Sequence, residues 1–195
     1  MRELQRLLPG EDIIYYGDSA NCPYGDKTAE QLFQLSSRML RFLSERQVKC
    51  TAVACNTISS MLDRLRPCFN HDIIGVIDGT ANYVIREKLQ HVGLVATEFT
   101  VSTGRYAQMI HRGNPDCHVV SRWSSKLAVM IDQGVQDDEE IDEEIRTQVD
   151  QILACERVDH LILGCTHYPI VEENFQHCYP NITMINPALE QAIEV

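Results

Sequence analysis

The sequence predicts an α/β fold in which parallel strands alternate with helices that cover both faces of the sheets. Short apolar runs of strand length alternate with longer segments whose apolar residues recur at helical spacing, and turn residues separate them. A second observation is a repeated unit. A strand-like run, a small residue and a cysteine follow one another at Ala54-Cys55 and again at Gly164-Cys165. Two thiols at equivalent points of two similar units suggest one site made by two facing halves.

In the first part of the chain, three short apolar runs are expected to be strands and three longer segments to be helices. The expected strands cover 12–16, 51–54 and 73–77. The expected helices cover 28–45, 58–65 and 80–89. Thr28 and Gln31 have the spacing of a capping box, which indicates where the first helix begins. Pro67 is expected to stop the second helix, because proline disrupts a helix interior.

The second part of the chain repeats the pattern. The expected strands cover 92–95, 117–121, 161–163 and 182–185. The expected helices cover 100–110, capped by Thr100 or Ser102, then 127–132, 138–155, a segment after Pro169 and a last segment from Pro187. Ile141, Ile145, Val149 and Ile152 lie on one face of the longest of these helices.

The composition argues against nucleic-acid binding and membrane insertion. The formal net charge is −11, whereas a phosphate-binding surface needs clustered Lys and Arg. Much of the acid lies in 137–144, which is typical of a solvated helix start. No apolar run reaches the roughly 18 residues of a membrane span, and the start of the chain has no signal-peptide core.

The cysteines and the known cofactor motifs point to a cytoplasmic protein without a metal or cofactor. Eight cysteines in a chain of this length, without a secretion signal, are expected to be reduced thiols. A structural zinc site is disfavoured because Cys165 and His167 are only two positions apart and no Cys-x-x-Cys pair occurs. There is also no Gly-rich phosphate loop and no Gly-x-Ser-x-Gly elbow.

Cys55 and Cys165 are the candidate reactive groups. Both follow predicted strands at the carboxyl end, where ligands bind in such sheets, and both precede predicted helices. The amino terminus of a helix favours anions, so we expect it to lower the thiol pKa. The alternative is that each is a small buried core residue, as free cysteines often are. The matched positions favour a pair of acid/base groups.

Several polar residues accompany the two cysteines, and each has a simpler structural explanation. His167 could act as an acid, a base or a thiol activator, or be a solvent-facing loop histidine. The other polar residues could hold a carboxylate or ammonium group, or could only cap helices and form turns. They are Asn56, Thr57, Thr97, Thr100, Thr166 and the Tyr24-Gly25 turn.

Five segments resemble those of a known family, in the same order along the chain. They are Tyr15-Tyr16-Gly17-Asp18-Ser19-Ala20, Pro23-Tyr24-Gly25, Val53-Ala54-Cys55-Asn56-Thr57, Thr97-x-x-Thr100 with Ser102 and Tyr106, and Leu163-Gly164-Cys165-Thr166-His167-Tyr168-Pro169. They resemble glutamate racemase, of the cofactor-independent aspartate/glutamate racemase superfamily, over nearly the whole chain. The Gly-Cys-Thr-His-Tyr-Pro stretch is the most specific of these motifs.

The resemblance implies two pseudo-symmetric α/β lobes with the active site in the cleft between them. Residues 1–78 with 186–195 would form the first lobe and 79–185 the second. The resemblance implies that Cys55 and Cys165 are the two acid/base thiols and that His167 assists Cys165. Asp132 would take the place of a family acidic residue that is usually glutamate. The amino acid would be held by Tyr24, Gly25, Asn56, Thr57, Thr97, Thr100 and Thr166.

The chain departs from the family pattern at both ends. The family opens with a strand and an Asp-Ser-Gly turn, whereas Met1 here stands in the helix after that strand. The family also continues past Asn186-Pro187-Ala188, and this chain stops at Val195. The first lobe is therefore expected to lack its first strand and its C-terminal part, and activity of this chain is left open.

The leading hypothesis is a racemase that interconverts L- and D-glutamate for peptidoglycan precursor supply. One thiolate removes the α-proton, and the opposite thiol delivers one to the other face. The alternatives are a racemase for aspartate or another amino acid, and a non-catalytic binding remnant. A small-molecule amino acid is the expected partner, and a homodimer is left open.

Overall fold

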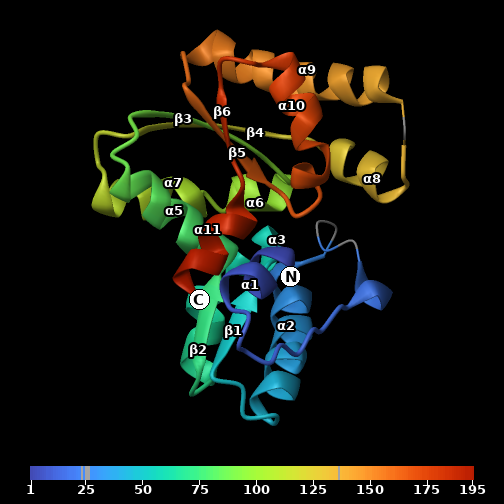
Figure 1. Cartoon of the computed structure of the whole chain (residues 1–195), viewed down its shortest axis with the longest axis vertical. Helices are drawn as coiled ribbons and strands as arrows, with labels where there is room; N and C mark the ends of the chain where they lie inside the picture. The colour runs from blue at the N-terminus through green and yellow to red at the C-terminus, as the bar shows by residue number, and fades with distance from the viewer. Residues whose placement is uncertain (23, 25–26, 136) are drawn as a thin grey trace.

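The computed structural model contains two parallel sheets, each packed against helices (Figure 1). It describes residues 1–22, 24, 27–135 and 137–195. Within these residues the first sheet pairs β1 (Cys50–Val53) with β2 (Asp72–Gly75). The second sheet has the order β4-β3-β5-β6, formed by β3 (His91–Ala96), β4 (His118–Trp123), β5 (His160–Gly164) and β6 (Thr183–Ile185). Every strand pair is parallel, as predicted.

Helices connect the strands in both parts of the molecule. In the first part they are α1 (Arg2–Leu7), α2 (Ala29–Ser44), α3 (Asn56–Ser59), α4 (Leu62–Leu65) and α5 (Val76–Arg86), with 3-10 turns at Ser19–Asn21 and Arg66–Cys68. In the second part they are α6 (Glu98–Ser102), α7 (Arg105–Gly113), α8 (Leu127–Asp132), α9 (Asp138–Cys155), α10 (Glu172–Cys178) and α11 (Pro187–Glu194), with the 3-10 turn η3 at Tyr168–Val171.

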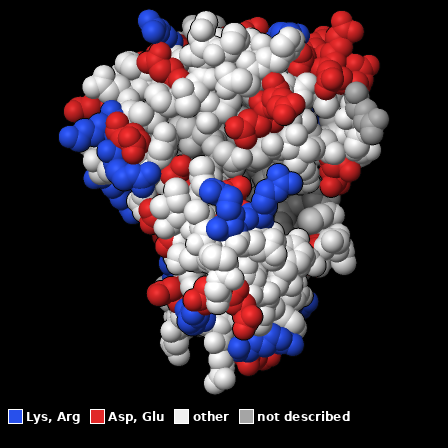
Figure 2. Space-filling model, viewed as in Figure 1, with Lys and Arg blue, Asp and Glu red and all other residues white. Residues whose placement is uncertain are grey.

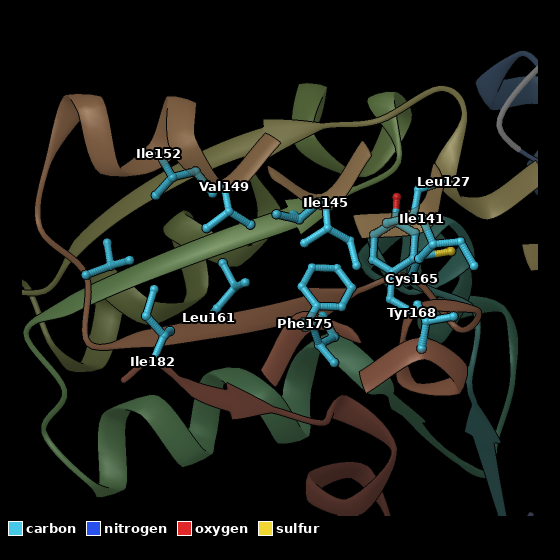
Figure 3. Packing of buried hydrophobic residues seen from close by; sticks show 14 residues of the cluster. Leu127, Ile141, Ile145, Val149, Ile152, Leu161, Cys165, Tyr168, Phe175 and Ile182 are labelled. Carbon is cyan, nitrogen blue, oxygen red and sulfur yellow. The ribbon is translucent and has the colours of Figure 1, made fainter. Parts of the chain in front are cut away.

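Three apolar cores hold these elements together. One core lies between the second sheet and α8, α9 and α10, and includes Ile145, Leu161 and Phe175 (Figure 3). A second core lies on the other face of that sheet, where α5 and α7 pack. The third joins α2, α3 and α4 to the small first sheet through residues such as Leu32 and Leu65. The central strands β3 and β5 are buried on both faces, which is why their sequences are almost continuously apolar.

Helix α11 returns from the second sheet to the first and packs against α5 (Figure 1). The side-chain amide of Gln191 donates to the carbonyl oxygens of Val53 at 3.0 Å and Ile74 at 2.8 Å. A Cβ atom on Gly79 would lie 2.7 Å from the backbone nitrogen of Gln191, so the two helices approach too closely for a side chain there. The last helix therefore fixes the ends of β1 and β2.

Helix signals in the sequence predict several boundaries correctly. Thr28 and Gln31 form the predicted capping box of α2, and α8 and α9 occupy the predicted residues. Asp137 caps α9, and the acidic first turn of that helix forms the red patch at the upper right of Figure 2. The acidic run is thus a solvated helix start, as expected. No helix within the described residues is both long and apolar enough to cross a bilayer.

Several predictions about the elements are wrong. The strand expected over 73–77 ends at Gly75, because Val76 and Ile77 begin α5. Residues 12–16 form no strand, because a strand needs a partner and β1 pairs only with β2 among the described residues; Tyr15 is 74% exposed. The helix expected over 58–65 divides into α3 and α4 at Ser60-Met61. The helix expected over 100–110 divides at Gly104, whose φ of +61° is outside the helical region.

Candidate active site

The first candidate thiol stands where β1 ends and α3 begins. Cys55 is the residue before α3, and its side chain is half-buried. Hydrogen bonding from the backbone amides of Thr57 and Ile58 and from the Thr57 hydroxyl acts to lower the pKa of its thiol. The local chain therefore gives this thiol three donors that favour its ionised form.

The second candidate thiol has the same surroundings at the end of β5. Hydrogen bonding from the backbone amides of Thr166 and His167 and from the Thr166 hydroxyl acts to lower the pKa of the Cys165 thiol. The residue is 6% exposed and forms one end of the core beside Ile141 and Tyr168 (Figure 3). Gly164 precedes it because a Cβ there would lie 2.6 Å from the Leu94 side chain on the neighbouring strand.

Burial, and not the helix ends, decides the protonation of the two thiols. It raises the pKa of Cys55 to about 11 and raises that of Cys165 above its ordinary value, although the nearby donors act in the opposite direction. The expectation of lowered thiol pKa values is therefore wrong in its net direction. Charge on Cys165 also raises the Cys55 pKa, so the two sulfurs lie within electrostatic reach of each other.

A histidine and a carboxylate extend from the second thiol. His167 Nδ1 lies 3.6 Å from Cys165 Sγ, and its Nε2 lies 3.4 Å from Asp132 Oδ1 at the end of α8. The Asp132 side chain is 76% exposed and that of His167 is 35% exposed, so the pair faces solvent. The structure thus brings together in one row three residues that lie in two separate segments of the chain.

Threonines from the two sheets meet between the cysteine turns. Thr57 Oγ1 lies 3.5 Å from Thr97 Oγ1, which in turn lies 2.9 Å from Thr100 Oγ1. Thr97 also caps α6 by accepting from the Thr100 amide, so capping and a place near the thiols coexist. Asn56 and Thr100 are buried, whereas Thr166 is exposed.

The remaining predicted binding residue approaches from the segment before α2. Tyr24 donates to Asp18 Oδ2 at 2.8 Å, and the charge of Cys55 contributes to a raised pKa of its phenol. Tyr24 therefore lies near the first thiol. Gly25, the other predicted residue of this turn, lies outside the described residues. Burial and the charges of Asp18 and Asp132 raise the pKa of Cys22 in the same segment, so this segment lies close to α8.

Three residues near the thiols were not among the predicted site residues. Asp18 accepts from Tyr24, and Tyr106 donates from α7 to Asn56 Oδ1 at 2.6 Å. Arg105 pairs with Asp63 across the two sheets. Asp18 and Tyr106 belong to the segments that resemble the family, but a polar residue on an amphipathic helix gives no sign of which contact it makes.

One group of metal-ligand side chains converges within the described residues, away from the thiols. Asp142, His177 and Cys178 hold their ligand atoms within 4.8 Å of one another where α9 meets α10. Asp142 already accepts hydrogen bonds from Asn174 at 3.0 Å and from His177 at 3.3 Å, and Arg146 lies 3.4 Å away. Hydrogen bonding between the two helices accounts for this group.

Comparison with known proteins identifies a family for this chain. The model of the Asp/Glu/Hydantoin racemase family matches residues 1–192. A glutamate racemase of Desulforudis audaxviator is 34% identical over 191 residues, which are 96% of this chain and 70% of that protein.

Two solved structures have the same fold. The glutamate racemase isoform RacE1 of Bacillus anthracis superposes with a TM-score of 0.92 at 32% identity, covering 99% of this chain and 73% of that one. The glutamate racemase of Francisella tularensis, solved in complex with D-glutamate, gives a TM-score of 0.91 at 31% identity, with the same two coverages of 99% and 73%. The chain belongs to the Asp/Glu/Hydantoin racemase family.

Proposed function

We propose that the protein is a cofactor-independent glutamate racemase that uses Cys55 and Cys165 as its two acid/base groups. The observation that carries the proposal is the pair of thiols, half-buried Cys55 and buried Cys165, each at the end of a strand and each followed by amides and a threonine hydroxyl that act to lower its pKa. Their electrostatic coupling supports a single site between them. The relatives named glutamate racemase support glutamate as the substrate.

The reaction needs one thiolate and one thiol. The thiolate takes the α-proton, the electron pair of the broken C–H bond stays on Cα, and the opposite thiol then gives its proton to the other face. The raised pKa values keep both groups protonated until one ionises. A negative sulfur raises the pKa of the other, so the second thiol keeps its proton and remains the acid.

The surrounding residues divide between proton handling and substrate binding in this proposal. His167 assists Cys165, because its Nδ1 lies 3.6 Å from the sulfur, and Asp132 orients the imidazole from the other side. Asn56, Thr57, Thr97, Thr100 and Thr166 offer hydroxyl and amide groups to the amino acid, and Tyr24 and Gly25 approach from the segment before α2.

The proposal divides the chain into two lobes, residues 1–78 with 186–195 and residues 79–185, with the substrate in the cleft between them. Each lobe contributes one thiol. The eight free cysteines support a reducing, cytoplasmic setting, in which D-glutamate would serve peptidoglycan precursor supply. Sedimentation of the purified protein would show whether it forms a homodimer.

The test is exchange of the α-proton in heavy water. The purified chain is incubated with L-glutamate, D-glutamate or L-aspartate, with a metal chelator and without any added cofactor. We expect loss of optical activity and one deuterium at Cα from both glutamate enantiomers. Faster reaction of aspartate would reassign the substrate. Binding of glutamate without deuterium uptake would show a non-catalytic protein.

A further inference from the structure

Tyr106 connects the part of the molecule around the four-stranded sheet to the part around the two-stranded sheet, next to Cys55. It lies on α7, which packs against the second sheet, yet its hydroxyl donates to Oδ1 of Asn56 at 2.6 Å. Asn56 directly follows Cys55 and is 3% exposed, and Tyr106 is 1% exposed. This short hydrogen bond is shielded from water, where such a contact is strongest.

The hydrogen bond also decides which way the Asn56 amide points. The phenol is a donor, so the carbonyl oxygen of the Asn56 side chain faces it and the amino group points away from it. Burial raises the pKa of Tyr106, which keeps the phenol protonated and therefore a donor. Charge on Cys165 acts in the same direction.

The neighbouring residue ties the start of α7 to the other half. Arg105 donates from its two terminal nitrogens to the two carboxylate oxygens of Asp63 on α4, at 2.6 and 2.7 Å. Its side chain is 9% exposed, so solvent screens the pair little on that side. Arg105 and Tyr106 therefore join the start of α7 to two residues beside the two-stranded sheet, Asp63 and Asn56.

We propose that Tyr106 is a positioning residue, which orients Asn56 and the Cys55 turn toward Cys165, and that the Arg105–Asp63 pair anchors it. This inference rests on the proposed racemase function for its catalytic consequence. Its geometric part concerns only the order of the Cys55 turn. Tyr106 acts through Asn56, because its hydroxyl holds the carbonyl oxygen of that side chain.

The first test measures thiol alkylation at each cysteine by peptide mass spectrometry, and it does not depend on turnover. In Tyr106→Phe, we expect Cys55 to react several-fold faster, because its turn loses a constraint, while Cys165 reacts as before. The matched control is Tyr179→Phe. It removes a phenol hydrogen bond of similar length, 2.7 Å to Asp150 Oδ1, which does not involve the candidate site residues. An equal rise at both cysteines, or none at Cys55, would overturn the proposal.

The second test uses substrate deuterium isotope effects, which report the proton-abstraction step. We expect Tyr106→Phe to lower kcat/KM by roughly 3- to 10-fold, the value of one hydrogen bond. The isotope effect should rise for the enantiomer that Cys55 deprotonates and fall for the other. The Cys165 enantiomer is identified as the one that Cys55→Ser still exchanges. Parallel isotope effects in both directions would contradict a role on the Cys55 side.

A weaker variant tests the anchor separately. Arg105→Lys keeps the positive charge beside Asp63 but removes the two-point contact. We expect the same changes in alkylation and isotope effect as in Tyr106→Phe, at smaller size. If Arg105→Lys matches the wild type in both measurements, the Arg105–Asp63 pair does not help to position Tyr106.

Discussion

The two cysteine turns share their hydrogen bonds but differ in what stands behind them. At each sulfur, two backbone amides and one threonine hydroxyl act to lower the thiol pKa, although the turns come from different sheets. Cys165 ends a central strand of the four-stranded sheet and has His167 beside it. Cys55 ends a strand of the two-stranded sheet and has Asn56, held by Tyr106.

This difference separates a common requirement from a local solution. A racemase must stabilise a negative sulfur on either face of the substrate, and the shared donors meet that need on both sides. In the proposed mechanism, proton handling is assisted on one side only, by the row from Cys165 to Asp132. Position is arranged on the other, by the contacts from α7. The following predictions test whether the two turns are equal where they match and unequal where they differ.

The largest effect is expected from the thiols themselves, and it should be equal on the two sides. Cys55→Ser and Cys165→Ser should each reduce racemisation by about 10²–10⁴-fold, because a serine hydroxyl is far less acidic than a thiol. Polarimetry with each glutamate enantiomer measures this. Cys68→Ser, which changes an exposed cysteine, is the control. A variant at either site with near-normal racemisation would refute the two-thiol mechanism.

The next effect should appear only on the Cys165 side. His167→Asn removes the imidazole and should lower kcat by roughly 10–100-fold, at the lower end of the range for one acid or base. Asp132→Asn should cost only a few-fold, because that carboxylate is 76% exposed and 3.4 Å from the ring. The pH dependence of kcat for the three proteins checks the order. Equal losses in both variants would mean that the carboxylate does more than orient the ring.

The sequence predicts the turns much better than their environment. Strand, small residue and cysteine are local features, so the order of residue types is enough to place Cys55 and Cys165 at strand ends. Capping residues are local too, and Thr28 and the bounds of α8 and α9 follow from them. Such features depend on neighbours in the chain and need no knowledge of distant contacts.

What the sequence could not give depends on contacts between distant segments. The strand expected over 12–16 fails because strand formation needs a bonded neighbour, which propensity does not supply. The expected lowering of the thiol pKa is wrong because burial raises the pKa more than the neighbouring donors lower it. The Tyr106–Asn56 contact joins residues 50 positions apart, and a polar residue on a helix does not announce its partner.

A smaller and symmetric effect is expected from the two threonines. Thr57→Val and Thr166→Val each remove one hydroxyl donor to a sulfur while keeping the shape of the side chain. Each should lower kcat/KM by about 2- to 10-fold, since one hydrogen bond is worth about 1 kcal/mol. Thr57 also lies against Thr97, so its loss should be somewhat the larger. Opposite signs in the two variants would break the correspondence between the turns.

The smallest effect concerns stability at alkaline pH, and it tests the burial that the two thiols share. The folded-state pKa of Cys55 is about 11, against an ordinary value of 9.0, so between these values the folded protein binds the proton that the unfolded chain has lost. The stabilisation from the protonated thiol is thus complete below pH 9 and is lost as the pH rises toward 11.

Denaturant unfolding at a series of pH values should show the free energy of unfolding falling through this window. Cys55→Ala and Cys165→Ala should each flatten the fall by at most about 1.4 kcal/mol per pH unit, the slope for one proton. Cys68→Ala should leave the slope as it is in the wild type, because its side chain is exposed. A slope that neither Cys55→Ala nor Cys165→Ala changes would mean that the two thiols have the same pKa in the folded and unfolded chain, and would contradict the raised pKa values.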